Sequence, residues 1–225
     1  MLARILIDTA VIPGGGTLRL IRRGEELSIM LSANELMNSR TSASEEALAR
    51  LSLEALGTVR APRVLIGGLG MGFTLRAALA TLGPNAKVEM AELVPEVVAW
   101  ARGPMAGLFG DSLSDPRLDL RVADVAELIR AARQTYDAIL LDVDNGPDGI
   151  SRTQNDQLYT VPGLAAARAA LRPGGMLAIW SSAPDEAFTR RLGRAGFRVE
   201  VKTVRSRADG KGPRHTIWLA SRTGA

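Results

Sequence analysis

The feature that most constrains the fold is a regular alternation of strand-like and helix-like segments from Arg63 onward. Short runs rich in Val, Ile and Leu are each followed by a longer segment of helical character. Strands are expected at 63–68, 87–93, 118–122, 136–143 and 175–182, and helices at 73–82, 95–102, 125–133, 161–171 and 184–195. This alternation predicts a parallel sheet with helices on both faces.

The C-terminal segments depart from the alternation. Residues 197–204 and 215–222 have the pattern of two strands joined by the polar turn RSRADGKGP. Strands joined by a hairpin are antiparallel. We therefore expect an α/β fold with a Rossmann-like, seven-stranded sheet that ends in an antiparallel strand.

The first 41 residues are expected to form a small N-terminal β unit, followed by the main domain at 42–225. Residues 3–12 and 17–31 predict two or three short strands. So thin a unit needs a partner surface, which predicts packing on the main domain or a homodimer through this unit. Residues 42–56 predict a helix with Ser42 as N-cap and Glu45 completing a capping box.

Composition narrows the class of protein. The 225 residues are 46% apolar, and the chain has no cysteine, which excludes disulfides, thiolate metal sites and cysteine nucleophiles. The N-terminal apolar run contains Asp8 and does not have the pattern of a signal peptide. No run reaches the ~20 apolar residues of a membrane span. We expect a cytoplasmic protein that does not enter a membrane.

Charge is distributed unevenly along the chain. The net charge is +4, and ten bases face only two acids from Phe188 onward. Such a region could meet nucleic acid or an acidic partner. No aromatic residues interleave with these bases, so a solvated, arginine-rich surface is the preferred interpretation, and nucleic acid is not the expected partner.

A glycine-rich segment follows the first strand of the alternating region. The sequence GGLGMG contains Gly67, Gly68, Gly70 and Gly72 between a strand and a helix. Glycine allows backbone conformations with positive φ and close approach of a ligand to the main chain. Ligands of such sheets bind at the carboxyl ends of the strands. This segment therefore predicts a cofactor site.

Acidic residues end the next three strands. Glu92, followed by Leu93, lies where a carboxylate can bind a ribose diol. Asp124, preceded by Ala123, can accept a hydrogen bond from an adenine amino group, or it can simply cap helix 125–133. Asp142 ends the fourth strand. GGLGMG lacks the GxGxxG spacing of dinucleotide dehydrogenases, which favours the class I S-adenosylmethionine-dependent methyltransferase fold.

Five motifs between residues 63 and 182 resemble the spermidine synthase (polyamine aminopropyltransferase) group of that fold. They are RVLIGGLGMG, AELVPEVV, VADVAEL, YDAILLDVDNGP and LYTVPGLAAARAALRPGG. The resemblance implies that the glycines contact the methionine part of S-adenosylmethionine or its decarboxylated form. It also implies that Glu92 binds the ribose, Asp124 the adenine and Asp142 a reacting amine, without a metal.

The chain departs from that group in several places. The group has two acids, three residues apart, at the end of the catalytic strand. The corresponding residues here are Asp142 and Asn145, with Asp144 between them, so Asp142 and Asp144 are the predicted catalytic acids. A Tyr-His-Glu motif on the preceding helix aligns with residues 44–46, which leaves Glu46. We expect Glu46, Asn145 and Tyr159 to bind the substrate, and the only histidine, His215, to be structural.

The glycine loop also bears on the donor. In the group that the chain resembles, an acid in this loop rejects the methionine carboxylate, whereas here Leu69 and Met71 occupy the loop and no acid is present. This favours intact S-adenosylmethionine and methyl transfer to a small-molecule acceptor, an amine by preference. The alternatives are a true aminopropyltransferase that makes a polyamine and a degenerate, non-catalytic nucleoside-binding protein.

Overall fold

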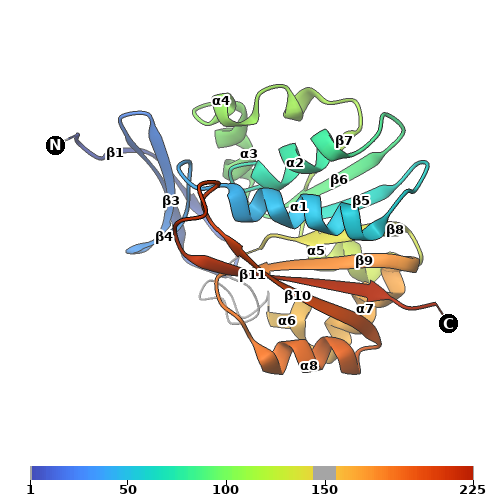
Figure 1. Ribbon diagram of the computed structural model, residues 1–225. Helices are drawn as coiled ribbons and strands as arrows, with labels where there is room; N and C mark the ends of the chain where they lie inside the picture. Colours follow the sequence, from blue (N-terminus) through green and yellow to red (C-terminus); the bar gives the residue numbers. More distant parts are fainter. Residues whose placement is uncertain (1, 144–155, 225) are drawn as a thin grey trace.

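Two β-sheets organise the protein, whose computed structural model describes residues 2–143 and 156–224 (Figure 1). The N-terminal sheet has four antiparallel strands in the order β1-β2-β3-β4. These strands are β1 (Ile5–Val11), β2 (Thr17–Arg23), β3 (Glu26–Leu31) and β4 (Asn34–Asn38).

The second sheet has seven strands in the order β10-β11-β9-β8-β5-β6-β7. The pairs from β9 to β7 are parallel, whereas β11 is antiparallel to both β9 and β10. Its strands are β5 (Arg63–Gly67), β6 (Lys87–Glu92), β7 (Leu118–Val122), β8 (Tyr136–Leu141), β9 (Leu171–Ser181), β10 (Phe197–Arg205) and β11 (Arg214–Arg222). The predicted α/β fold with an antiparallel final strand is confirmed.

Helices cover both faces of this sheet, as Figure 1 shows. One face carries α1 (Ala43–Leu56), α2 (Phe73–Thr81) and α3 (Pro95–Arg102), and the other carries α5 (Val125–Ala131), α7 (Val161–Ala170) and α8 (Glu186–Arg194). Short helices lie at α4 (Ala106–Phe109), η1 (Ser112–Ser114) and α6 (Asp156–Tyr159). Alternate residues of a strand point to opposite faces, so Val64 and Ile66 join one apolar core and Leu65 the other.

The N-terminal sheet packs on the main sheet through the first of these cores. Leu20 and Ile29 are buried in the same cluster as residues of α1 and α2. The indole N–H of Trp100, on α3, also donates to Asp8 on β1 at 2.7 Å. The sequence predicted two or three strands here, and the fourth, β4, forms by pairing with β3. The predicted boundary after residue 41 falls between β4 and α1.

The predicted capping box of α1 is wrong. Ser42 makes no side-chain capping bond, and the Ala43 N–H donates instead to the carbonyl of Ser206, in the turn between β10 and β11, at 3.2 Å. The Glu45 carboxylate accepts from the Ser44 hydroxyl rather than from the Ser42 amide. A tertiary contact has replaced the local cap that the sequence suggested.

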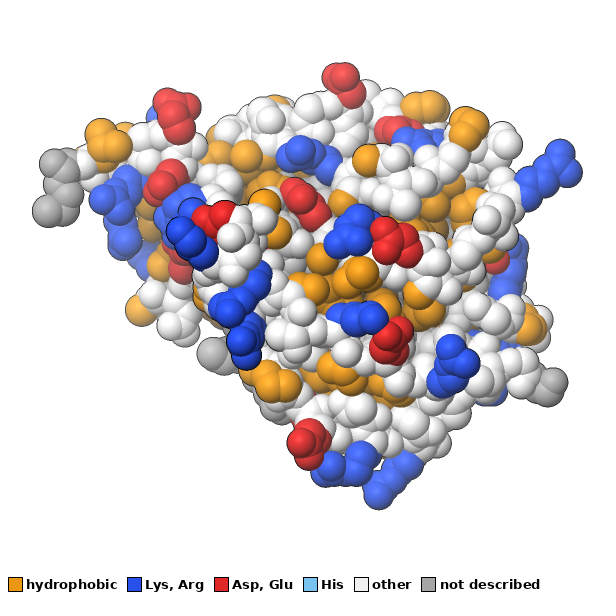
Figure 2. Space-filling view, in the orientation of Figure 1, with side chains coloured by type: hydrophobic (Ala, Val, Ile, Leu, Met, Phe, Trp, Pro, Cys, Tyr) orange, Lys and Arg blue, Asp and Glu red, His pale blue; other side chains and the backbone are white. Residues whose placement is uncertain are grey.

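The charged surface is mixed. Several bases of the C-terminal region pair with nearby acids, namely Arg190 with Glu186, Lys202 with Glu200 and Arg207 with Asp209. On the face shown in Figure 2, Lys and Arg side chains are spread among acidic and apolar ones and do not gather in one patch. Within the described ranges, no helix is both long enough and apolar enough to cross a membrane.

Candidate functional site

The carboxyl ends of four neighbouring strands are tied together by main-chain hydrogen bonds. The Gly68 amide donates to the carbonyl of Ala91, Ala123 to Glu92, and Asp142 to Gly67, each at 2.9 Å. These bonds continue the parallel pairing of β7, β6, β5 and β8 beyond the strands themselves. The predicted residues therefore meet at one edge of the sheet, as parallel topology requires.

Two of the four glycines line the cavity at this edge. Gly68 has φ 91°, and a Cβ atom there would lie 2.2 Å from the carbonyl oxygen of Asp142. Gly70 has φ 48°, and its Cβ would lie 2.8 Å from the sulfur of Met37. Only glycine permits both the positive φ and these close approaches. The loop is thus shaped by contacts with β8 and with the N-terminal sheet.

The other two predicted glycines have packing roles. A Cβ atom on Gly67 would meet the Val125 side chain at 2.9 Å, so this residue allows α5 to approach β5. Gly72 precedes α2, and its Cβ would lie 2.2 Å from the ring of Phe109. Neither of these glycines lines the cavity of Gly68 and Gly70.

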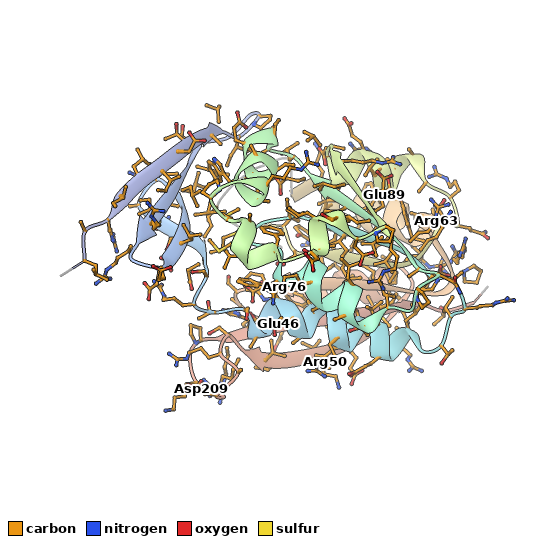
Figure 3. All side chains as sticks on the ribbon, turned by 90° about the horizontal axis from the view of Figure 1, so that it is seen from above. Glu46, Arg50, Arg63, Arg76, Glu89 and Asp209 are labelled. Carbon is orange, nitrogen blue, oxygen red and sulfur yellow. The ribbon has the colours of Figure 1, made fainter. Side chains whose placement is uncertain are left out.

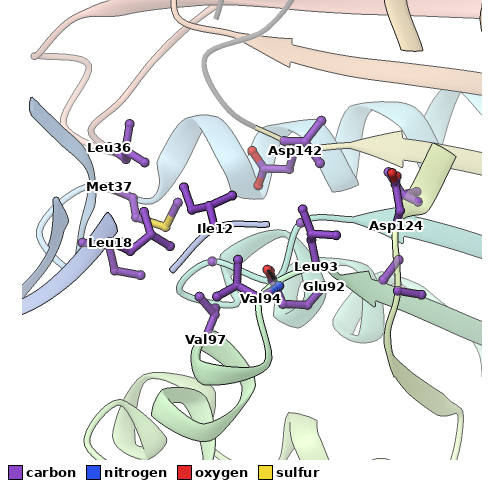
Figure 4. Close-up of a pocket in the computed structure, with 17 residues that line it drawn as sticks. Ile12, Leu18, Leu36, Met37, Glu92, Leu93, Val94, Val97, Asp124 and Asp142 are labelled. Carbon is purple, nitrogen blue, oxygen red and sulfur yellow. Dashed lines mark hydrogen bonds between the residues drawn. The ribbon is translucent and has the colours of Figure 1, made fainter. Parts of the chain in front are cut away.

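We call that space the donor cavity, because the sequence motifs predict that the donor binds there; it measures about 110 Å³. Its polar wall comes from the strand ends and contains the predicted residues Leu93 and Ala123 together with three carboxylates. Figure 4 shows Glu92, Asp124 and Asp142 reaching it from separate strand ends, opposite apolar side chains of the N-terminal sheet. Those apolar residues are Leu18, Ile29, Leu36 and Met37, and Ile12, directly after β1, lies beside them.

Glu92 is 8% exposed, and the backbone holds its carboxylate in place. Its Oε2 accepts from the Leu69 amide and its Oε1 from the Val94 amide, both at 2.9 Å. Burial raises the pKa of Glu92, while these amides oppose the shift. A carboxylate oxygen can accept more than one hydrogen bond, and Glu92 lines the cavity, so its side chain can also accept from a diol there.

Asp124 caps a helix and also lines the cavity, so the structure is compatible with both interpretations of its position. Its Oδ1 accepts from the Ala126 amide at 2.8 Å, which makes it the N-cap of α5. It also lines the donor cavity. Because the cap uses Oδ1, Oδ2 can accept a hydrogen bond from an amino group in the cavity.

Asp142 lies at the junction of the donor cavity and a second cavity. Its Oδ2 accepts from the Thr74 hydroxyl, in the first turn of α2, at 2.6 Å. Burial and the negative charge of Glu45 raise the pKa of Asp142 to about 7, against the opposing effect of the Thr74 bond. A carboxylate with this pKa can take up and release a proton near neutrality.

The second cavity adjoins the donor cavity through four shared residues, Leu36, Met37, Gly70 and Asp142. Glu45 supplies another carboxylate, and burial raises its pKa. The remaining lining residues are Leu69, Met71, Gly72, Phe73 and Trp180. Two acids in an otherwise apolar pocket suit a cationic or amine ligand.

The structure changes the predicted substrate-binding set. Glu46 is exposed and does not line the second cavity, whereas its neighbour Glu45 does (Figure 3 labels Glu46). Tyr159 is 2% exposed and packs edge to face on Phe188 in the opposite core, outside both cavities. Asp144 and Asn145 lie outside the described residues, so their roles stay predictions.

Sequence reasoning missed three residues of this site. Thr74 was hidden in an ordinary helical segment, although a hydroxyl in the first helical turn after a glycine loop is a usable signal. Met37 comes from β4 and Trp180 from β9, and only tertiary packing brings them to the cavities. No local pattern identifies those two residues.

Comparisons with known proteins bear on the fold and on the class of protein. A family model described as S-adenosyl-L-methionine-dependent methyltransferase matches residues 106–210. Polyamine aminopropyltransferase 1 of Streptomyces coelicolor is 37% identical over 123 residues, which are 54% of this chain and 22% of that protein. Putrescine N-methyltransferase 2 of Nicotiana attenuata is 35% identical over 124 residues, covering 54% of this chain and 32% of that protein.

Among solved structures, spermidine synthase from Thermotoga maritima superimposes with a TM-score of 0.75 at 19% identity. The superposition covers 98% of this chain and 74% of that chain. Fold and site thus define a protein of the class I S-adenosylmethionine-dependent methyltransferase fold. Within that class the chain is spermidine synthase-like, as its motifs predicted. The chain matches only about a fifth to a third of the length of the two curated relatives named above.

Proposed function

We propose that the protein transfers an alkyl group from an adenosyl sulfonium donor to an amine, with aminopropyl transfer from decarboxylated S-adenosylmethionine as the favoured reaction. The observation that carries this proposal is the position of Asp142, which lines both cavities. A carboxylate at that junction can hold an amine beside the carbon it attacks. Holding reactants in this way is a large part of catalysis by such a site.

The donor cavity has residues that fit an adenosyl group. Glu92 would accept from the ribose diol and Asp124 from the adenine amino group, while Gly68 and Gly70 leave room for the sulfur substituents. The apolar side chains of the N-terminal sheet would cover the base. When bound, the sulfonium activates its neighbouring carbon toward a nucleophile.

The charge of the site favours a donor without a carboxylate. No Lys, Arg or His side chain of the described residues lines either cavity. A methionine carboxylate there would face Asp142 and Glu45 without a cationic partner, and like charges in a partly buried site repel. An aminopropyl tail carries an ammonium group, which those acids would stabilise.

This argument replaces the preference for methyl transfer, which the comparisons do not confirm. That preference rested on Leu69 and Met71, which leave the glycine loop without an acid. The structure supplies the carboxylate from α1 instead, through Glu45. The resemblance to polyamine aminopropyltransferases supports the same choice.

Methyl transfer is the second candidate, because one relative is named putrescine N-methyltransferase and the matching family model describes methyltransferases. Both candidates need the same steps from this chain. Asp142 holds the acceptor amine at the junction of the two cavities, and Thr74 fixes the orientation of its carboxylate. The ammonium form of the amine loses a proton to Glu45, the other acid of the second cavity. The neutral amine then attacks in line with the bond to sulfur.

Calorimetric titration distinguishes the two candidates. We expect decarboxylated S-adenosylmethionine to bind at least about tenfold more tightly than the intact form, a difference of about 1.4 kcal/mol. Turnover is then measured with each donor and a panel of diamines and monoamines. Tighter binding and turnover of intact S-adenosylmethionine would select methyl transfer, and failure of both donors to bind would refute the proposal.

A further inference from the structure

A hydrogen-bonded row of side chains leads from the second cavity to the start of β11. The Ser44 hydroxyl donates to the carboxylate of Glu45, and its oxygen lies 2.8 Å from Nδ1 of His215. Glu45 lines the second cavity. His215 is the only histidine in the sequence. The row therefore links the acids of the cavity to a single imidazole.

The fold holds this row in place. Ser44 is fully buried on α1, and the β10–β11 turn lies beside the start of that helix in Figures 1 and 3. The bond from the Ala43 amide to the Ser206 carbonyl joins the two elements. The indole of Trp180, which lines the second cavity, contacts the His215 ring edge to face at 4.7 Å between centroids.

The two ends of the row differ in exposure. Glu45 lines the cavity, whereas His215 lies outside it and is partly exposed. The residue opposite His215 on β10 is the uncharged Val204, and the neighbouring pair Arg205 and Arg214 is exposed. The carboxylate of Glu45 is thus the charged group that is linked to His215 by hydrogen bonds, through the Ser44 hydroxyl.

We propose that Glu45, Ser44 and His215 form a relay that carries the proton of the acceptor amine from the second cavity to solvent. The inference rests on the proposed amine alkylation and adds a route for the proton that this reaction releases. Glu45 takes the proton of the amine that Asp142 holds, and Ser44 and His215 act through Glu45. Nothing in the sequence motifs assigned a role to His215 beyond structure.

The proton and electron pairs balance as follows. The bound ammonium gives one proton to the Glu45 carboxylate, and the freed lone pair forms the new N–C bond as the C–S bond breaks with its electrons left on sulfur. Protonated Glu45 turns its O–H toward Ser44 Oγ, and the Ser44 hydroxyl turns toward the unprotonated Nδ1 of the Nε2–H tautomer of His215. The Glu45 proton then passes to Ser44 Oγ while the Ser44 hydroxyl proton passes to Nδ1. The imidazolium releases its Nε2 proton to water, and proton exchange with solvent restores the Nε2–H tautomer before the next turnover.

The electrostatics of the end groups fit this direction of transfer. Burial raises the pKa of Glu45, which makes its carboxylate a better proton acceptor. Burial lowers the pKa of His215, so its imidazole is neutral at rest and returns the proton to solvent readily.

The first test does not depend on catalysis. Because the chain has one histidine, ¹⁵N NMR of the imidazole gives a single side-chain titration. We expect Glu45→Gln to lower the pKa of His215 by about one pH unit, because the carboxylate that stabilises the imidazolium through Ser44 is lost. Glu46→Gln, which neutralises the exposed acid one residue further along α1, is the matched control and should change the pKa of His215 much less. Equal shifts in the two variants would overturn the relay.

The second test uses turnover of the full chain. We expect His215→Gln, which retains an amide able to bond Ser44, to lower kcat at least about tenfold with little change in the KM of donor or amine. In His215→Ala, added imidazole should restore part of the lost rate. Thermal melting of both variants establishes that they fold.

The outcomes separate the relay from the function on which it rests. A wild-type protein that alkylates no amine refutes the proposed function, and the NMR comparison still decides whether Glu45 and His215 are linked. An active wild-type protein with an unchanged kcat and pH profile in His215→Gln refutes the relay alone. Loss of rate without any rescue by imidazole assigns His215 a structural role and also overturns the proposal.

Discussion

Replacing Asp142 by Asn should make the protein more stable at alkaline pH while it abolishes turnover. The folded protein holds this carboxyl beside Glu45, partly buried, with a pKa raised from 3.8 to about 7. The unfolded chain gives up the same proton far more easily. Ionisation of this carboxyl in the folded state therefore lowers the free energy of unfolding of the wild-type protein. Asn at this position carries no charge and avoids that loss.

The sign and size follow from the difference in pKa between the two states. A folded pKa above the unfolded value means that the free energy of unfolding falls as pH rises from about 4 to about 7, and then levels off. Each unit of pKa difference is equivalent to about 1.4 kcal/mol, so the full loss in the free energy of unfolding approaches roughly 4 kcal/mol. Since the side chain is partly exposed, we expect about half of this, near 2 kcal/mol.

Urea unfolding followed by circular dichroism measures this difference at about pH 5 and about pH 8. At the higher pH, Asp142→Asn should have a larger free energy of unfolding than the wild type. The difference should narrow at the lower pH, where the wild-type carboxyl is protonated in the folded state. Asp124→Asn is the matched control, since it changes another strand-end carboxylate whose capping bond Asn can also accept. The Asn side chain at 142 keeps an oxygen for Thr74.

A difference that stays constant with pH, or an Asp142→Asn variant less stable than the wild type at about pH 8, would refute this reasoning. Retention of wild-type turnover by the variant would refute the role of Asp142 as the amine's carboxylate. The two results are independent, because one concerns the charge of the empty site and the other the reaction.

Three further predictions concern binding, the glycine loop and assembly. Glu92→Gln should weaken binding of the adenosyl donor by about 10- to 100-fold in calorimetry, because a neutral amide accepts weaker hydrogen bonds from the diol; unchanged affinity would exclude the diol contact. Gly68→Ala should destabilise the protein by at least about 2 kcal/mol more than Gly110→Ala, since both have positive φ but only Gly68 would clash, with the Asp142 carbonyl; equal losses in thermal melts would contradict this. A homodimer through the N-terminal sheet stays a prediction, and Leu6, 55% exposed on β1, offers its test: Leu6→Asp should reduce the mass found by light scattering to that of a monomer, and a wild type that is itself monomeric would disprove it.

The sequence was sufficient for the main sheet because its central strands are predominantly apolar. All six residues of β8 are buried, and Asp137, which pairs with Arg172, is the one charged residue among them. The acids at the strand ends then follow from topology, since parallel strands place their carboxyl ends at one edge. Glu92, Asp124 and Asp142 were therefore found without coordinates.

The errors come from features that tertiary contacts decide. Successive residues of a helix differ by about 100° in direction, so choosing between Glu45 and Glu46 required the orientation of α1, which the turn before β11 helps to fix. Tyr159 follows the segment after β8 in sequence, yet aromatic packing on Phe188 places it in the core. Such choices depend on neighbours that are distant along the chain.

The most direct test of the central claim is a crystal structure with 5′-methylthioadenosine, the thioether that aminopropyl transfer would leave behind. We expect the adenine amino group within hydrogen-bond distance of Asp124, the ribose diol on Glu92, and the sulfur beside Gly68 and Asp142. A nucleoside bound away from this edge of the sheet, or an inverted one with its base toward Glu45, would contradict the account.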